Sequence, residues 1–173
     1  MWPENIASHG SCEIASCLHK VLITPANVTN KWRLIFFDSC SGQNKNNVMF
    51  NWYYALITKG LYDCIEHYFL IPGHMYLLTD RDFGVIEKKL RQIEQWYDTV
   101  RKSRVKQPFN VIKMDTQDFR DFQTLDKQIT RKQYAEDGHK FEIRNIVAVK
   151  VDKIPGALFF QIYIFWSWRL AND

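Results

Sequence analysis

The chain has 173 residues, a length that fits one domain of ordinary size and allows a full hydrophobic core. Its content of 46% hydrophobic and 15% aromatic residues argues against intrinsic disorder. The formal charge of +4 permits a polyanionic partner without requiring one. No run of about 18 apolar residues is present, so the sequence predicts no membrane span.

Cysteine usage indicates the compartment. Cys12, Cys17, Cys40 and Cys64 form no C-x-x-C pair and have apolar neighbours, which predicts buried free thiols. The first residues lack the basic and apolar regions of a signal peptide. We therefore expect an intracellular protein, nuclear or cytoplasmic, with reduced thiols.

The first half of the chain alternates helical and strand patterns. Ser11 can cap a helix whose apolar residues repeat at helical spacing up to Leu22. Residues 34–37 form a continuous apolar run, which is typical of a central parallel strand covered on both faces. A polar turn over 39–47 follows, and residues 48–59 then form a helix that is apolar nearly all round, with Gly60 as its stop signal.

Further elements follow in the second half. Residues 65–71 predict a strand that ends at Pro72-Gly73, and a strongly amphipathic helix begins at Thr79 or Asp80. The remaining elements are a basic loop at 101–106, a short strand at 109–114, a helix at 115–129, and strands at 141–151 and 158–166. This alternation predicts an α/β fold, with a core over residues 1–98 and a β-rich C-terminal extension over 99–173.

Asp38 is the sharpest candidate for chemistry. It ends a buried apolar run and opens a polar turn, and open α/β sheets place ligand sites outside the carboxyl ends of their strands. A carboxylate there needs a cation or hydrogen bonds to offset its desolvation. The structural alternative is an Asx-turn in which the side chain accepts hydrogen bonds from the backbone amides of residues 39–41.

Other acids and a histidine are expected near the same edge. On the predicted third helix, Asp80 and Glu87 fall within about 20° of each other, whereas Asp82 lies on the opposite flank. Helix capping is the alternative role for Asp80 or Asp82. His74 follows a strand end and can donate to a phosphate or shuttle a proton, or it is an ordinary loop residue.

Basic and amide side chains form the predicted contact with nucleic acid. Lys45 lies in the run Gln43-Asn44-Lys45-Asn46-Asn47, which can contact phosphate oxygens at the start of a helix. A simple N-cap at Asn46 or Asn47 is an equal alternative. The other predicted nucleic-acid contacts are Lys88, Lys89, Arg91, Arg101, Lys102 and Arg104, and Lys106 extends the same basic loop.

These motifs resemble a domain family of animals found in proteins that look derived from DNA transposons. The resemblance rests on Asp38-Ser-Cys-Ser-Gly-Gln-Asn-Lys-Asn, on Pro72-Gly-His74 and on Asp80-Arg-Asp82-Phe-Gly-Val-Ile-Glu87-Lys. It extends from Glu13-Ile-Ala-Ser-Cys to Asp118-Phe-Arg-Asp-Phe, and so covers the chain up to about residue 130.

The family is similar to the ribonuclease-H-like DDE transposases and integrases. The resemblance implies that Asp38 matches the second catalytic acid and Asp80 the third, with Glu87 as competitor. Glu13 is similar to the first-helix glutamate of ribonuclease H. The first acid of such sites lies on a first strand, and the first three strands of that fold have no counterpart in this sequence. We therefore expect a chain truncated at its N-terminus.

Three functions remain open at this point. The leading hypothesis is metal-dependent cleavage or strand transfer of DNA phosphodiesters in the full-length ancestor, with Mg²⁺ or Mn²⁺ held by Asp38, Asp80 and a missing upstream aspartate. This chain alone is expected to be inactive. The alternative is a non-catalytic nucleic-acid-binding or protein-interaction module, with a protein partner or a second copy covering the missing sheet edge. The third is an α/β fragment without function.

Overall fold

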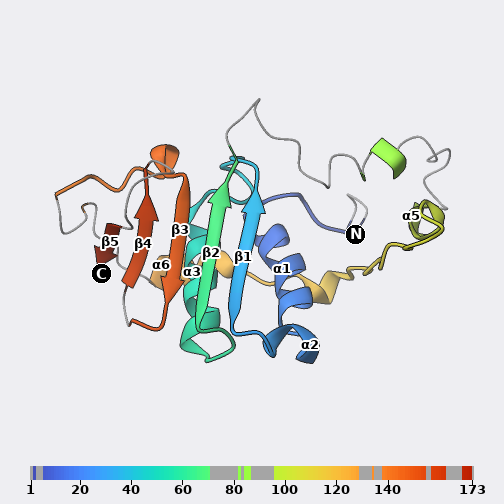
Figure 1. The fold of residues 1–173 in the computed structure, drawn as a ribbon, viewed down its shortest axis with the longest axis horizontal. Helices are drawn as coiled ribbons and strands as arrows, with labels where there is room; N and C mark the ends of the chain where they lie inside the picture. Colours follow the sequence, from blue (N-terminus) through green and yellow to red (C-terminus); the bar gives the residue numbers. More distant parts are fainter. Residues whose placement is uncertain are drawn as a thin grey trace.

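The strands form one mixed sheet. The computed structural model describes residues 2, 6–70, 82, 84–86, 96–128, 134, 138–154, 157–162 and 169–172. Among these residues, five strands lie in the order β1-β2-β3-β4-β5 (Figure 1). β1 (Trp32–Phe37) is parallel to β2 (Cys64–Phe69), whereas β3 (Ala148–Asp152), β4 (Ala157–Gln161) and β5 (Arg169–Asn172) each run antiparallel to the strand before. The expected α/β class is confirmed.

Helices cover one face of this sheet. The helical elements are α1 (Ser11–Leu22), α2 (Pro25–Val28), α3 (Asn47–Thr58), α5 (Trp96–Lys102) and α6 (Phe122–Gln128), with short 3-10 helices η2 (Thr116–Asp118) and η3 (Ile143–Asn145). α3 packs against the sheet, and α1 and α6 pack against α3. Figure 1 shows α3 and α6 behind the strands, with α1 behind and beside β1. No helix among the described residues has the length and apolarity needed to cross a membrane.

The core lies between α3 and the sheet. Phe50, Trp52, Tyr53 and Leu56 of α3 are buried, and they share one cluster with Ile65 and the inward-facing residues of β3 and β4. The helix contacts the sheet on one side and α1 and α6 on others, which explains why its sequence is apolar nearly all round. Gly60 follows it with φ of +68°, as its stop signal predicts.

Several predicted elements differ from the observed ones. α1 spans the predicted residues, but its N-cap is Gly10 and not Ser11. Residues 109–114 form neither helix nor strand. Val111 and Met114 are nevertheless buried, so the apolar residues that suggested a strand pack without sheet pairing. The predicted helix at 115–129 is divided into η2 and α6, and the strand predicted from residue 141 begins only at Ala148.

The C-terminal strands belong to the same sheet as the first two. Tyr68 of β2 pairs with Ala148 of β3, 80 residues later in the sequence. β3, β4 and β5 all follow the boundary predicted at residue 99, yet they extend the sheet that β1 and β2 begin. The two predicted portions of the chain therefore share one sheet.

β1 is open on the face away from the helices. The prediction of a strand covered on both faces was wrong, because exposed and half-buried residues alternate along β1. Trp32, Leu34 and Phe36 are 61%, 58% and 47% exposed. Leu34 pairs with Glu66 and Phe36 with Tyr68, so these two residues of β2 share the open face. Apart from Arg33, the strand is apolar on both sides, although only one side is packed.

Candidate functional site at the carboxyl end of strand β1

The parallel pairing brings the ends of β1 and β2 together. The carbonyl of Phe37 accepts a hydrogen bond of 2.8 Å from the backbone N–H of Leu70. Ser39 Oγ donates to the carbonyl of Leu70 at 2.9 Å, one residue after Asp38. The turn that follows β1 is therefore tied to the segment that follows β2, and Asp38 stands at the carboxyl edge of the sheet as predicted.

The carboxylate of Asp38 is exposed but held on one side. Its Oδ1 accepts from the backbone N–H of Cys40 at 3.3 Å, which is the Asx-turn foreseen as the structural alternative. The same oxygen accepts a shorter hydrogen bond, 2.6 Å, from Nδ2 of Asn44. Within the described part of the chain, its Oδ2 accepts no hydrogen bond. One carboxylate oxygen is thus fixed and the other is available.

Asn44 supports this carboxylate from a buried position. Only 4% of Asn44 is exposed, and its own Oδ1 has no hydrogen-bond partner among the described residues. Its backbone N–H donates to the carbonyl of Cys40 at 3.0 Å, as do those of Gln43 and Lys45 at 3.2 and 3.1 Å. A buried carbonyl oxygen without a donor costs roughly 1–3 kcal/mol of stability. The turn therefore holds an unsatisfied oxygen beside an exposed carboxylate.

Lys45 is buried and contacts the protein itself. Its Nζ donates to the carbonyl of Arg144 at 2.9 Å and lies 5.2 Å from the centre of the Phe69 ring. Burial lowers the pKa of this ammonium group. These contacts join the start of α3 to η3. They favour a structural role for Lys45 over the phosphate contact that the sequence predicted.

Asn46 is the N-cap of α3. Its Oδ1 accepts from the backbone N–H of Met49 at 3.1 Å, and its Nδ2 donates to the carbonyl of Ser41 at 3.0 Å. The capping alternative for this residue is confirmed. The amide-rich run after Asp38 therefore starts the helix and closes the turn.

The remaining predicted acids are not brought to Asp38 by the described structure. Asp80, Glu87 and His74 lie outside the described residues, so their place beside Asp38 stays a prediction. Asp82 forms an ion pair with Arg104, and Glu13 accepts a hydrogen bond of 2.8 Å from Ser8. In the part of the chain that the structure describes, no three His, Cys, Asp or Glu side chains are grouped to hold a metal ion.

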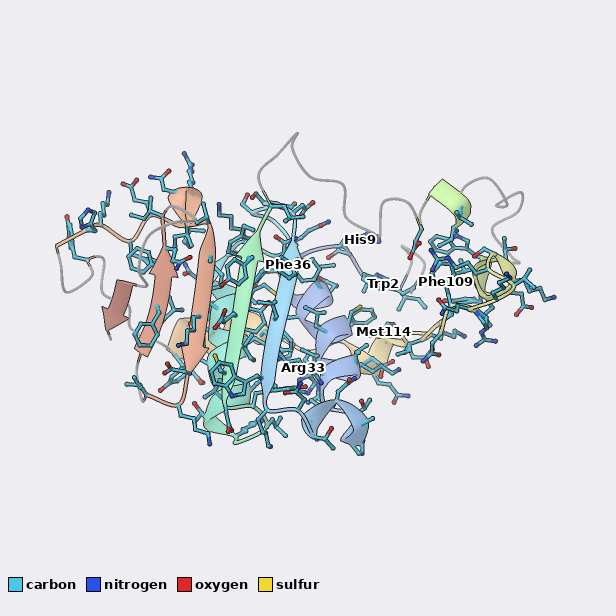
Figure 2. The ribbon with its side chains drawn as sticks, viewed as in Figure 1. Trp2, His9, Arg33, Phe36, Phe109 and Met114 are labelled. Carbon is cyan, nitrogen blue, oxygen red and sulfur yellow. The ribbon has the colours of Figure 1, made fainter. Side chains whose placement is uncertain are left out.

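The basic residues fall into three groups. Lys88, Lys89 and Arg91 lie outside the described residues. Arg101 and Lys102 are exposed on α5, where Arg101 is 3.9 Å from Asp98. Arg104 is paired with Asp82 and lies 5.1 Å from the centre of the Phe109 ring. Figure 1 shows α5 to the side of the sheet, beyond α1, and Figure 2 shows Phe109 in that same region, away from Phe36 on β1.

The cysteines are free, as predicted. Cys64 is buried, whereas Cys12, Cys17 and Cys40 are only half-buried, so the expectation of four buried thiols holds for one of them.

Sequence reasoning missed Asn44 as the partner of Asp38 and treated it as a phosphate contact. A signal was available, because a carboxylate at a strand end needs donors and an amide six residues later can reach back across the turn.

The family model described as Domain of unknown function (DUF7869) matches residues 3–154, which include β1, β2 and β3. No curated protein and no solved structure matches the chain.

Proposed function

Because the chain belongs to the DUF7869 family, we propose a function from the Asp38 edge itself: a ribonuclease-H-like domain of transposase ancestry, whose ancestor cleaved or joined DNA phosphodiesters with a metal ion, and which retains part of the metal site without activity of its own. The observation that carries this proposal is the exposed carboxylate of Asp38 at the carboxyl end of a parallel strand. Ligands of open α/β sheets bind at this edge. The order α1, β1, α3, β2, with the short α2 between α1 and β1, and the motif that begins at Asp38 support the ancestry.

The donor set fits a hard cation. Mg²⁺ and Mn²⁺ prefer carboxylate oxygens, and Asp38 Oδ2 is an oxygen of that kind that accepts no hydrogen bond from described residues. A bound cation would neutralise charge that develops on the phosphate. In this proposal Asp80 supplies a second carboxylate, Glu87 competes for that role, and His74 donates to phosphate or moves a proton.

Contact with DNA would be made away from the bases. Arg101 and Lys102 are exposed cations on α5 and can contact phosphates without reading sequence. Arg104 is already paired with Asp82, so its contribution to DNA binding requires exchange of that partner. We therefore propose non-specific, salt-sensitive binding.

The test is cation affinity with and without the carboxylate. Mn²⁺ binding to the full chain is titrated by electron paramagnetic resonance, and Asp38→Asn is expected to weaken it at least about tenfold, because a ligand is lost. Asp63→Asn is the matched control: this acid pairs with Lys153 at the amino end of β2, and its loss should leave the affinity unchanged. Equal Mn²⁺ affinity of the wild type and Asp38→Asn would remove the basis of the proposal.

A non-catalytic protein-interaction module is the second candidate. The open face of β1, with Trp32, Leu34 and Phe36 exposed, is the observation that favours it, since adjacent exposed apolar side chains mark interaction surfaces. If the open face of β1 mediates self-association, Leu34→Lys should dissociate the assembly. The sedimentation coefficient would then fall to that of the monomer, and Mn²⁺ affinity would stay unchanged. A monomeric wild type whose sedimentation does not change in the variant would exclude self-association through this face.

A further inference from the structure

Asp38 and Asn44 lie side by side at the carboxyl end of β1, joined by a hydrogen bond of 2.6 Å. We propose that Asn44 completes the site: its amide donates to Asp38 when no cation is bound, and turns over to present Oδ1 as a second ligand when a divalent cation binds. This inference rests on the proposed function, because it takes Asp38 to be a ligand. It adds a ligand that is not an acid.

The spacing of the two side chains suits this role. Asn44 Nδ2 lies 2.6 Å from Asp38 Oδ1. Turning the amide by half a rotation places Asn44 Oδ1 near the present position of Nδ2, beside the carboxylate. Neighbouring oxygens of an octahedral Mg²⁺ site are about 3 Å apart, since metal–oxygen distances are about 2.1 Å. The two oxygens would need to move apart by only a few tenths of an ångström.

The turnover exchanges one unsatisfied buried atom for another. In the described structure Asn44 Oδ1 is buried without a donor. After the turn, Nδ2 takes that place as a buried donor without an acceptor, so the number of unsatisfied atoms stays the same. The lost hydrogen bond to Asp38 is replaced by ligation of a cation to both side chains. The cation therefore decides which orientation is favoured.

The backbone around Asn44 keeps the side chain in place for either state. The N–H groups of Asn44 and Lys45 donate to the carbonyl of Cys40, and Asn46 caps α3 immediately afterwards. The Lys45 ammonium is engaged at the carbonyl of Arg144. Apart from the shift of a few tenths of an ångström between the two oxygens, rotation of one amide is thus the only change that the proposal requires.

The experiment compares two substitutions of Asn44 with a matched control in the full chain, using Mn²⁺ as the probe. Asn44→Leu, which has neither donor nor acceptor, is expected to weaken Mn²⁺ binding at least about tenfold, the lower end of losses seen when metal-supporting residues are changed. Asn51→Leu is the control. Asn51 is also buried and also donates to an aspartate, Asp126 Oδ1, at 2.6 Å, so its removal is a similar lesion away from the site. It should leave Mn²⁺ affinity unchanged.

Asn44→Asp separates a ligand from a hydrogen-bond donor. The substitution keeps the shape but removes the donor and places two carboxylates side by side, where they repel each other unless a cation lies between them. We expect a melting temperature below that of the wild type without cation, a larger rise on addition of Mn²⁺, and Mn²⁺ affinity at least equal to that of the wild type. A turn that cannot place an oxygen of residue 44 beside Asp38 would show no such gain.

The outcomes distinguish this inference from the function on which it rests. If Asp38→Asn loses Mn²⁺ binding while Asn44→Leu keeps it, the role of Asn44 is wrong and the proposed function stands. If Asn44→Asp loses affinity as Asn44→Leu does, Asn44 acts only as a donor, and the turnover is wrong. If the wild type does not bind Mn²⁺, or binds it no better than Asp38→Asn, both proposals fail. Circular dichroism shows whether each variant is folded, and Asn44→Asp decides the matter where Asn44→Leu does not fold.

Discussion

Lowering the pH from 7 to 5 should destabilise this protein through one buried histidine. His67 on β2 is fully buried, its Nδ1 lies 2.9 Å from the hydroxyl of Tyr53, and burial lowers its pKa from 6.5 to about 3. Below pH 6.5 the unfolded chain therefore binds a proton at this imidazole that the folded protein does not. Stability contributed by the neutral side chain is complete above pH 6.5 and falls as the pH decreases towards 3. Linkage gives a loss of about 2 kcal/mol between pH 7 and pH 5.

The assay is urea unfolding at pH 7, 6 and 5, with His67→Gln as the comparison. The free energy of unfolding of the variant should fall less than that of the wild type, by about 2 kcal/mol over this range. The difference between the two proteins removes the effect of His19, whose pKa burial also lowers, and of the carboxyl groups. Tyr53→Phe keeps the imidazole buried and should keep the wild-type pH dependence. Superimposable pH dependences of His67→Gln and the wild type would refute the reasoning.

Three further predictions concern the site and its surroundings. Lys45→Met should lower the free energy of unfolding by about 1.5–3 kcal/mol, because the hydrogen bond of a charged group to the Arg144 carbonyl is lost. Its DNA affinity, measured by filter binding, should stay the same. A variant with full stability and weaker DNA binding would contradict this prediction. DNA affinity should fall steeply between about 50 and 200 mM salt, and the double substitution Arg101→Ala and Lys102→Ala should reduce it further. A DNA affinity that does not change with salt would exclude phosphate contacts as its main source. Nicking of supercoiled plasmid with Mg²⁺ or Mn²⁺ should stay at background, since two-metal chemistry needs several carboxylates and the first acid expected for such a site has no counterpart in this sequence. Robust nicking that Asp38→Asn abolishes would overturn this expectation.

The elements that could be predicted are those whose signals are local. α1, α3 and β2 follow from helical spacing, a glycine stop and a short apolar run, all within a dozen residues. The pairing of β2 with β3 could not be predicted, because the register joins Tyr68 to Ala148 and no local pattern encodes so distant a partner. For the same reason the sequence did not distinguish residues 109–114, which are mostly apolar but lie in no strand, from a strand.

The position of Asp38 was predictable to a similar degree. Its place could be predicted because a carboxylate after an apolar run marks a strand end. The roles of its neighbours depended on burial, which is a tertiary property. A lysine in a polar turn has the pattern of a surface cation, yet Lys45 is covered because the carbonyl that it contacts belongs to Arg144, 99 residues later. Asn44 was read as a surface amide for the same reason.

The hydrogen bonds of the turn after β1 indicate whether each of its polar side chains stabilises the fold or is placed for a ligand. Asn46 closes the turn and caps α3, and Lys45 anchors it to η3, so these two side chains account for its structure. Asn44 differs, because one end of its amide holds an exposed carboxylate and the other is buried with no partner among the described residues. A turn selected only for shape gains nothing from a buried orphan oxygen, which lowers stability by roughly 1–3 kcal/mol. Preorganised ligand sites tolerate such losses because their polar groups are held for a ligand rather than for one another. Asp38 and Asn44 are for this reason the residues at which substitution should separate function from folding.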